Sequence, residues 1–127
     1  CSSDLSVDNM NKAIEKVSGE FNISIPEYTV VGFPYENFFA HRWYVSTNDT
    51  VDPKTLRDRI DAILRELNDD YATERDSALK EVFLEVLPEE TFMKFMAEKG
   101  KIGSQHKFPR VMKGKMLADW EAFLSRR

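Results

Sequence analysis

The sequence predicts an α+β domain, in which a small mixed β-sheet of three or more strands carries packed helices. Its 127 residues suit one domain, and an apolar fraction of 42% can fill a core without disulfides or metal. Segments of helical and strand periodicity follow each other as helix, strand, strand, helix, strand, helix, helix. A helix between the second and third strands permits a right-handed parallel crossover, which makes the predicted sheet mixed.

A helix and a hairpin are predicted in the first part of the chain. Residues 28–33 and 39–47 are rich in aromatic and β-branched side chains, which predicts two strands, and residues 34–38 form the turn. The short connection favours an antiparallel hairpin. Residues 7–21 precede them as a helix with one apolar face, formed by Met10, Ala13, Ile14, Val17 and Phe21.

The next predicted helix begins at Asp52-Pro53, an N-cap residue followed by proline at the first helical position. Its polar face, which includes Asp61, is expected to face water. Residues 71–76 either continue this helix or form a second short one. Residues 82–87 are mostly apolar, which predicts a central third strand. The apolar face of the helix consists of Leu56, Ile60, Ile63, Leu64 and Leu67.

Two further helices are predicted near the end of the chain. Residues 88–91 open the first, and four of its apolar side chains read most simply as core. Residues 111–112 form a short strand. The second helix has an amphipathic face made by Met116, Leu117, Trp120, Phe123 and Leu124, and the core residues of the first are Phe92, Met93, Phe95 and Met96.

Composition excludes several classes of function. The formal net charge of −4 argues against a general nucleic-acid binder. No apolar run approaches the roughly 20 residues of a membrane-spanning helix. A single cysteine, Cys1, fits a reducing compartment and so a cytoplasmic location, although it also suits the start of a processed lipoprotein or a fragment of a longer protein. Two histidines and one cysteine are too few for a protein-only zinc site, and we expect no bound metal.

Residues 99–110, Lys-Gly-Lys-Ile-Gly-Ser-Gln-His-Lys-Phe-Pro-Arg, concentrate positive charge on an acidic chain. Composition alone favours a solvated basic loop. Pro109 biases Phe108 towards an extended backbone, which would present Lys107 at a defined angle to a phosphoryl or carboxylate oxygen. His106, in this loop, is a better functional candidate than His41, which reads as a packed strand residue.

Three motifs carry a resemblance to a known family. They are Leu-Asn-Asp-Asp-Tyr-Ala-Thr-Glu-Arg at residues 67–75, Phe-Met-Lys-Phe at 92–95, and Lys-Gly-Lys-Ile-Gly-Ser-Gln-His-Lys-Phe-Pro-Arg at 99–110. In this order the sequence resembles the C-terminal end of the auxin-responsive family of acyl-acid amido synthetases, in its bacterial form. That family is similar to acyl-CoA synthetases, adenylation domains and luciferases.

The resemblance implies that residues 1–127 are the mobile C-terminal lid of an acyl-adenylate-forming ligase, which uses ATP and Mg²⁺. Its partners would be an N-terminal adenylation domain of the same chain, a small carboxylic acid and an amine. Lys107 matches the motif lysine and would be catalytic, whereas substrate or nucleotide would be bound by Gly103, Gln105, His106 and Arg110. No phosphate-binding loop occurs in the chain, so the domain alone is expected to be inactive and to bind no cofactor.

Two other classes of function compete with this interpretation. One is a stand-alone α+β binding or interaction module, including a lipoprotein domain beginning at Cys1. The other is an RNA-binding domain of split βαβ type, which fits less well because the charge is wrong and no strand carries the paired aromatic signature.

Overall fold

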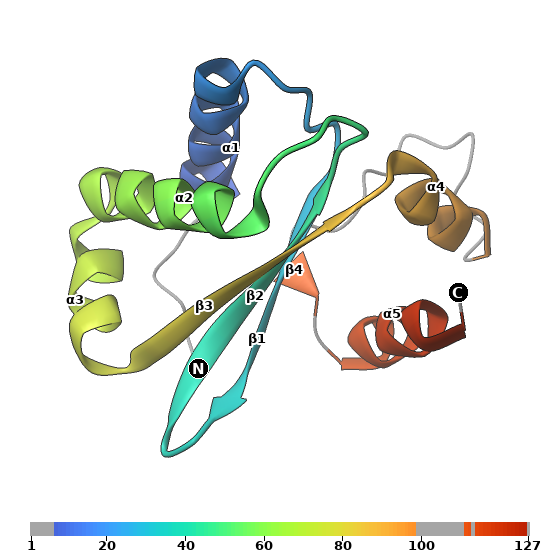
Figure 1. Cartoon of the computed structure of the whole chain (residues 1–127). Coiled ribbons are helices and arrows are strands. Elements are labelled where there is room, and N and C mark those ends of the chain that lie inside the picture. Colours follow the sequence, from blue (N-terminus) through green and yellow to red (C-terminus); the bar gives the residue numbers. More distant parts are fainter. Residues whose placement is uncertain (1–6, 99–110, 113, 127) are drawn as a thin grey trace.

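The protein is a four-stranded mixed sheet with helices on both faces (Figure 1). The computed structural model describes residues 7–98, 111–112 and 114–126. This architecture confirms the predicted α+β class. In chain order the elements are α1 (Val7–Phe21), β1 (Tyr28–Tyr35), β2 (Phe38–Ser46), α2 (Pro53–Leu67), α3 (Asp69–Ser77), β3 (Leu79–Leu87), α4 (Glu89–Glu98), β4 (Val111–Met112) and α5 (Gly114–Arg126).

The strand order is β3-β2-β1-β4. β1 and β2 form the predicted antiparallel hairpin, whereas β2–β3 and β1–β4 pair in parallel. The predicted turn at residues 34–38 is too long, because Pro34 still pairs with Phe39 and Tyr35 with Phe38. Only two residues therefore connect the strands, and the first of them, Glu36, has a positive φ of 55°.

The third strand differs from its prediction in two respects. It begins at Leu79 rather than at residue 82, and it lies at an edge of the sheet, so the prediction of a central strand was wrong. Its apolar side chains are accounted for by packing on both faces of the sheet. The neighbouring helices also supply hydrogen-bond donors to the strand: Arg57 of α2 donates to the carbonyl oxygen of Val82 at 3.3 Å, and Arg75 of α3 to that of Leu79 at 2.8 Å.

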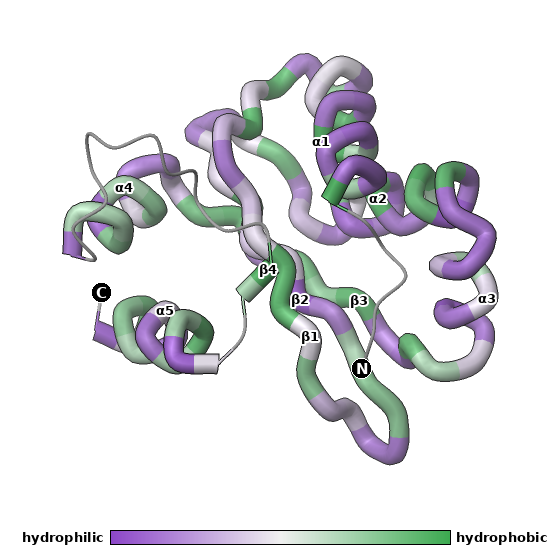
Figure 2. Tube along the Cα trace, turned by 180° about the vertical axis from the view of Figure 1, so that it is seen from behind, coloured by the Kyte–Doolittle hydropathy of each residue, from purple (hydrophilic) through white to green (hydrophobic). Residues whose placement is uncertain are grey.

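Two hydrophobic clusters fill the space between the helices and the sheet. In Figure 1, α1, α2 and α3 lie on one side of the sheet and α4 and α5 on the other, and Figure 2 shows hydrophilic residues along the outer sides of α1 and α2. We call the first cluster aliphatic: Met10, Ala13, Ile14, Val17, Tyr28, Val30, Trp43, Val45, Leu56, Ile60, Ile63, Leu64, Tyr71, Leu79 and Val82. The second, aromatic cluster consists of Val31, Tyr44, Leu87, Phe92, Phe95, Met96, Met112, Trp120 and Phe123.

Asn68 separates α2 from α3. Residues 71–76 therefore belong to a second helix and do not continue the first. Its backbone N–H donates to the carbonyl oxygen of Leu64 at 3.0 Å, which closes α2. Its side-chain oxygen accepts from the backbone N–H of Tyr71 at 3.0 Å, which caps α3. The predicted start of α2 is confirmed, since Asp52 accepts from the backbone N–H of Thr55 at 3.1 Å.

Candidate functional site

The predicted site residues fall in the segment between α4 and β4. Lys107, Gly103, Gln105, His106 and Arg110 all lie outside the described residues, so their predicted roles stay predictions. The described elements on either side show how the two ends of this segment, residues 99–110, are held.

The return of this segment to the sheet is fixed by β4. Val111 pairs with Val30 and Met112 with Val31, which places β4 parallel to β1 at the sheet edge. The Met112 side chain is only 1% exposed and belongs to the aromatic cluster. Burial of that side chain gives β4 a defined position although the strand contains only two residues.

The entry to the segment is held by α4, which packs against α5 through aromatic rings. The Trp120 ring of α5 is fully buried, and its centroid lies 5.0 Å from that of Phe95 and 5.3 Å from that of Phe92. At the last residue of α4, the Glu98 carboxylate accepts from Arg126 at 3.1 Å. Met93 of the same helix is 55% exposed, so its assignment to the core was wrong.

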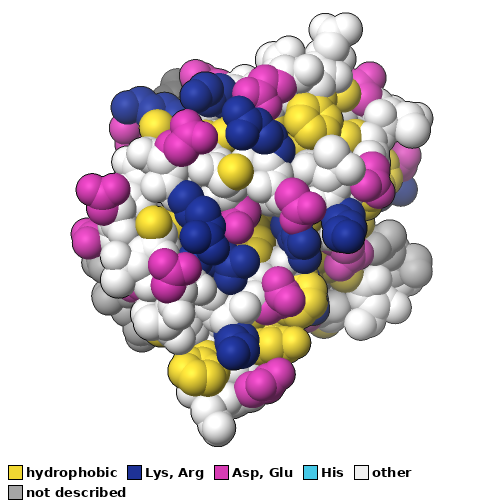
Figure 3. Space-filling model, turned by 60° about the vertical axis from the view of Figure 1, so that its left-hand side comes forward, with side chains coloured by type: hydrophobic (Ala, Val, Ile, Leu, Met, Phe, Trp, Pro, Cys, Tyr) yellow, Lys and Arg dark blue, Asp and Glu magenta, His cyan; other side chains and the backbone are white. Residues whose placement is uncertain are grey.

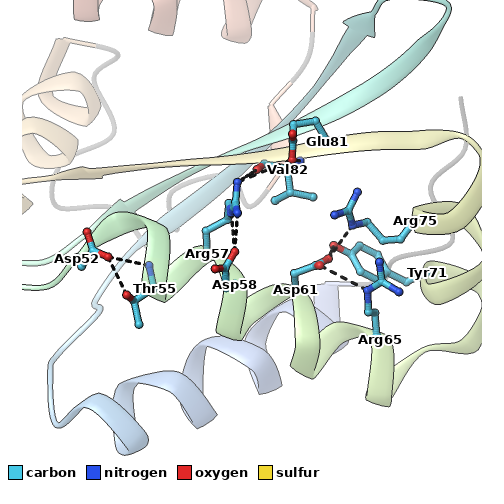
Figure 4. Close-up of polar contacts among 10 residues, drawn as sticks. All are labelled: Asp52, Thr55, Arg57, Asp58, Asp61, Arg65, Tyr71, Arg75, Glu81 and Val82. Atoms are coloured by element: carbon cyan, nitrogen blue, oxygen red, sulfur yellow. Dashed lines mark hydrogen bonds and ion pairs between the residues drawn. The ribbon is translucent and has the colours of Figure 1, made fainter.

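The motif at residues 67–75 folds into a polar network on the other side of the sheet (Figure 4). The Asp61 carboxylate of α2 is its centre: one oxygen accepts from the Tyr71 hydroxyl at 2.6 Å and from Arg75 Nε at 2.9 Å. Its other oxygen accepts from Arg65 at 3.4 Å. Since Arg75 also binds the carbonyl oxygen of Leu79, the network joins α2, α3 and the start of β3.

The electrostatics of this network suit a structural role. Burial, followed by the neighbouring Asp61 carboxylate, raises the pKa of the Tyr71 phenol above its ordinary value. The hydroxyl therefore stays protonated and acts as a donor. Asp61 itself was expected to face water, but its side chain is only 17% exposed. The signal that could have identified it is the Tyr71–Arg75 pair, four residues apart on one face of a helix.

His41 is a packed strand residue, as predicted. It is 5% exposed, and burial, with a smaller contribution from the charge of Arg75, lowers its pKa from 6.5 to about 4. The imidazole is therefore neutral near pH 7.

The described residues contain no group of three or more His, Cys, Asp or Glu side chains that could hold a metal ion. On the side that carries α2 and α3, acidic and basic side chains alternate, without a large patch of one sign (Figure 3). Within the same part of the chain, no helix is both long and apolar enough to span a membrane.

The described elements define a small α+β domain with helices on both faces of a four-stranded mixed sheet. The sequence matches the GH3 family C-terminal domain over residues 8–115, so the chain belongs to this family. This membership confirms the family resemblance carried by the sequence motifs. No curated protein matches the sequence.

Solved structures with the same fold include AtGH3.15 acyl acid amido synthetase in complex with 2,4-DB, with a TM-score of 0.68 and 18% identity. A second is GH3.15 acyl acid amido synthetase, with a TM-score of 0.70 and 17% identity. The matches cover 95% and 91% of this chain but only 25% and 23% of those chains. The chain thus spans about a quarter of each of these larger proteins.

Proposed function

We propose that this chain is the C-terminal lid domain of a cytoplasmic, ATP-dependent acyl-acid amido synthetase. Membership of the GH3 family C-terminal domain carries the proposal. The similar structures are named acyl acid amido synthetases, and this chain spans about a quarter of each. The remaining part of such a protein would be an N-terminal domain of the same chain, over which the lid closes.

The reaction has two steps. A carboxylate oxygen of the acid attacks the α-phosphorus of ATP, which forms an acyl-adenylate and releases pyrophosphate. An amine then attacks the acyl carbon, forms the amide and releases AMP. Negative charge gathers on the phosphoryl and carboxylate oxygens in the first step, and a lysine ammonium placed there stabilises it. We assign this role to Lys107, while Gly103, Gln105, His106 and Arg110 shape the segment and bind substrate or nucleotide.

The described elements that flank residues 99–110 support this proposal because they are firmly packed. Met112 of β4 lies in the aromatic cluster, and Phe95 of α4 contacts the Trp120 ring. The chain spans only about a quarter of the similar solved proteins, so we assign Mg²⁺ and the ATP pocket to the preceding domain.

The test is acid-dependent ATP–pyrophosphate exchange by the full-length protein. Lys107→Ala is expected to lower the rate by more than tenfold, equivalent to about 1.4 kcal/mol or more. Lys115→Ala is the matched control, because Lys115 is an exposed lysine of α5 that binds only Asp119 among the described residues. An unchanged rate in Lys107→Ala would remove this lysine from the mechanism.

The 127-residue chain provides a second test. Alone it is expected to show no exchange with any acid, because its partner domain supplies the ATP and acid pockets. Exchange activity of the isolated chain would contradict its role as a lid.

A further inference from the structure

The aromatic cluster joins α4 and α5 to one face of the sheet, around Val31, Tyr44 and Leu87. The part of this face towards the β1–β2 turn carries a group of side chains that we call the aromatic patch: Phe33, Tyr35, Phe38, Arg42 and Phe83. The strand register places them on one face, since Arg42 stands opposite Phe83 on β3 and opposite Val31 on β1, and Tyr35 stands opposite Phe38. Val31 belongs to the aromatic cluster, so the patch continues the face that α4 and α5 cover.

The patch is an ordered arrangement of rings around a cation. The Arg42 guanidinium carbon lies 5.2 Å from the ring centroid of Phe33 and 5.5 Å from that of Phe83. These two rings stack at 6.0 Å, and Tyr35 meets Phe83 edge-on at 5.7 Å. Phe38 is 45% exposed.

Within the described part of the chain, Arg42 has no ion-pair partner. Burial raises the pKa of the nearby Tyr44 phenol, and Arg42 lowers it. Among the described residues, however, no carboxylate lies within ion-pair distance of Arg42, unlike Arg57, Arg59 and Arg75. A guanidinium that lies over two rings can still donate its N–H groups to an incoming carboxylate.

We propose that the aromatic patch docks the preceding large domain of the same protein, which presents apolar side chains and a carboxylate to Arg42. The proposal rests on the lid function proposed above. The similar solved chains are about four times as long as the matched region, and a tethered domain meets the patch at high effective concentration. Aromatic side chains and an arginine are typical of the energetic centre of interfaces.

A second copy of this chain fits the patch less well. In a two-fold symmetric contact the patch would meet its own copy, which brings Arg42 and Lys80 against identical charges. Lys80 lies 5.2 Å over the Phe38 ring, inside the same surface. A different surface that carries a carboxylate avoids this repulsion.

Docking here would also place the large domain beside the last elements of the chain. Met112 pairs with Val31 and so lies on the face that carries the patch. A domain seated on the patch therefore stands on the side of the sheet that carries α4 and α5.

The test is hydroxyl-radical footprinting of the full-length protein and of the 127-residue chain, read out by mass spectrometry. We expect several-fold slower labelling of Tyr35, Phe38 and Phe83 in the full-length protein. Phe92 and Phe95 are buried in either form and should label slowly in both, which shows that the isolated chain is folded. Equal labelling of the patch in both proteins would overturn the proposal, as would protection in the isolated chain that grows with its concentration.

Two variants of the full-length protein sharpen the test. Arg42→Glu should restore labelling of Phe38 and Phe83 to the level of the isolated chain. Lys16→Glu is the control, because Lys16 is an exposed cation of α1, on the opposite side of the sheet. If Phe38 and Phe83 still label slowly in the Arg42→Glu protein, the proposed pairing of Arg42 with a carboxylate of the large domain is wrong. Footprinting needs no turnover, so its outcome is independent of the ATP–pyrophosphate exchange that tests the lid function.

Discussion

The two sides of the sheet are held together by different kinds of interaction. On one side, aliphatic packing is combined with directional bonds from Asp61 to Tyr71 and Arg75. On the other, α4 and α5 are held mainly by aromatic rings around Trp120. Hydrogen bonds fix the orientation of the groups that they join, whereas ring contacts tolerate small displacements.

This difference matches what each side has to support. The helices α2 and α3 connect β2 to β3, and this connection needs only one fixed arrangement of the helices. The α4–α5 side supports both ends of residues 99–110, the segment with the predicted site. We therefore expect perturbations of the two clusters to act locally, each on its own side of the sheet.

Trp120→Ala is the strongest test of this separation. Loss of a fully buried indole should destabilise the protein by about 3–5 kcal/mol. Urea unfolding measures this change in the free energy of unfolding. Amide hydrogen exchange should accelerate first in α4, β4 and α5. Met93→Ala, at an exposed position of α4, should change stability by less than about 0.5 kcal/mol. Equal acceleration in α1 and α2 would show that the two sides form one cooperative unit.

Asp61→Ala tests the opposite side. It removes the acceptor of three hydrogen bonds and leaves Arg75, whose side chain is 15% exposed, without its counter-charge. We expect a loss of about 3 kcal/mol in urea unfolding, at the lower limit for breaking a buried pair because the site is not fully buried. Asp58→Ala is the control: that carboxylate is 56% exposed and should contribute less than about 1 kcal/mol. Equal losses in the free energy of unfolding of Asp61→Ala and Asp58→Ala would mean that the network around Asp61 stabilises the protein no more than an exposed ion pair does.

Much of the fold could be predicted because amphipathic spacing and capping act locally. The apolar faces of α1, α2 and α5 and the Asp52 cap are properties of neighbouring residues. The position of β3 is not local. An apolar strand can be buried by helices that pack over an edge as well as by strands on either side, so composition cannot distinguish the two positions.

The sequence likewise predicts one part of the candidate site and not another. The motif that ends in Arg75 was recognised, but its role became clear only with the distances from Asp61 to Tyr71 and Arg75. An aspartate on the polar face of a helix predicts solvent contact, and only tertiary packing shows otherwise. Lys107 and its neighbours are predicted from the family motif, and the ATP–pyrophosphate exchange assay tests them.

His41 should make the aliphatic side sensitive to acid. Its pKa is about 4 in the folded protein and 6.5 when unfolded, so the unfolded state binds the extra proton between these values. The stability contribution is therefore complete above pH 6.5, declines as pH falls towards 4, and amounts to a loss of about 2 kcal/mol between pH 7 and pH 5. Urea unfolding at both values should show this loss, and His41→Gln should remove it. An unaltered pH dependence in the variant would assign the loss to other groups.

Glu36→Gly has the smallest expected effect and the opposite sign. Glu36 occupies the left-handed region at φ 55° in the β1–β2 turn, where a Cβ is strained and glycine is not. The substitution should stabilise the protein by about 0.5–1 kcal/mol in urea unfolding, since relief of strain exceeds the added freedom of the unfolded chain. Asn22→Gly is the matched control at φ 56°, and it should gain less because asparagine tolerates this region. The turn lies beyond both clusters, so this gain should add to the effect of Trp120→Ala or Asp61→Ala. If Glu36→Gly changes the stability loss caused by Trp120→Ala, the hairpin turn is coupled to α4 and α5. If it changes the loss caused by Asp61→Ala, the turn is coupled to α2 and α3.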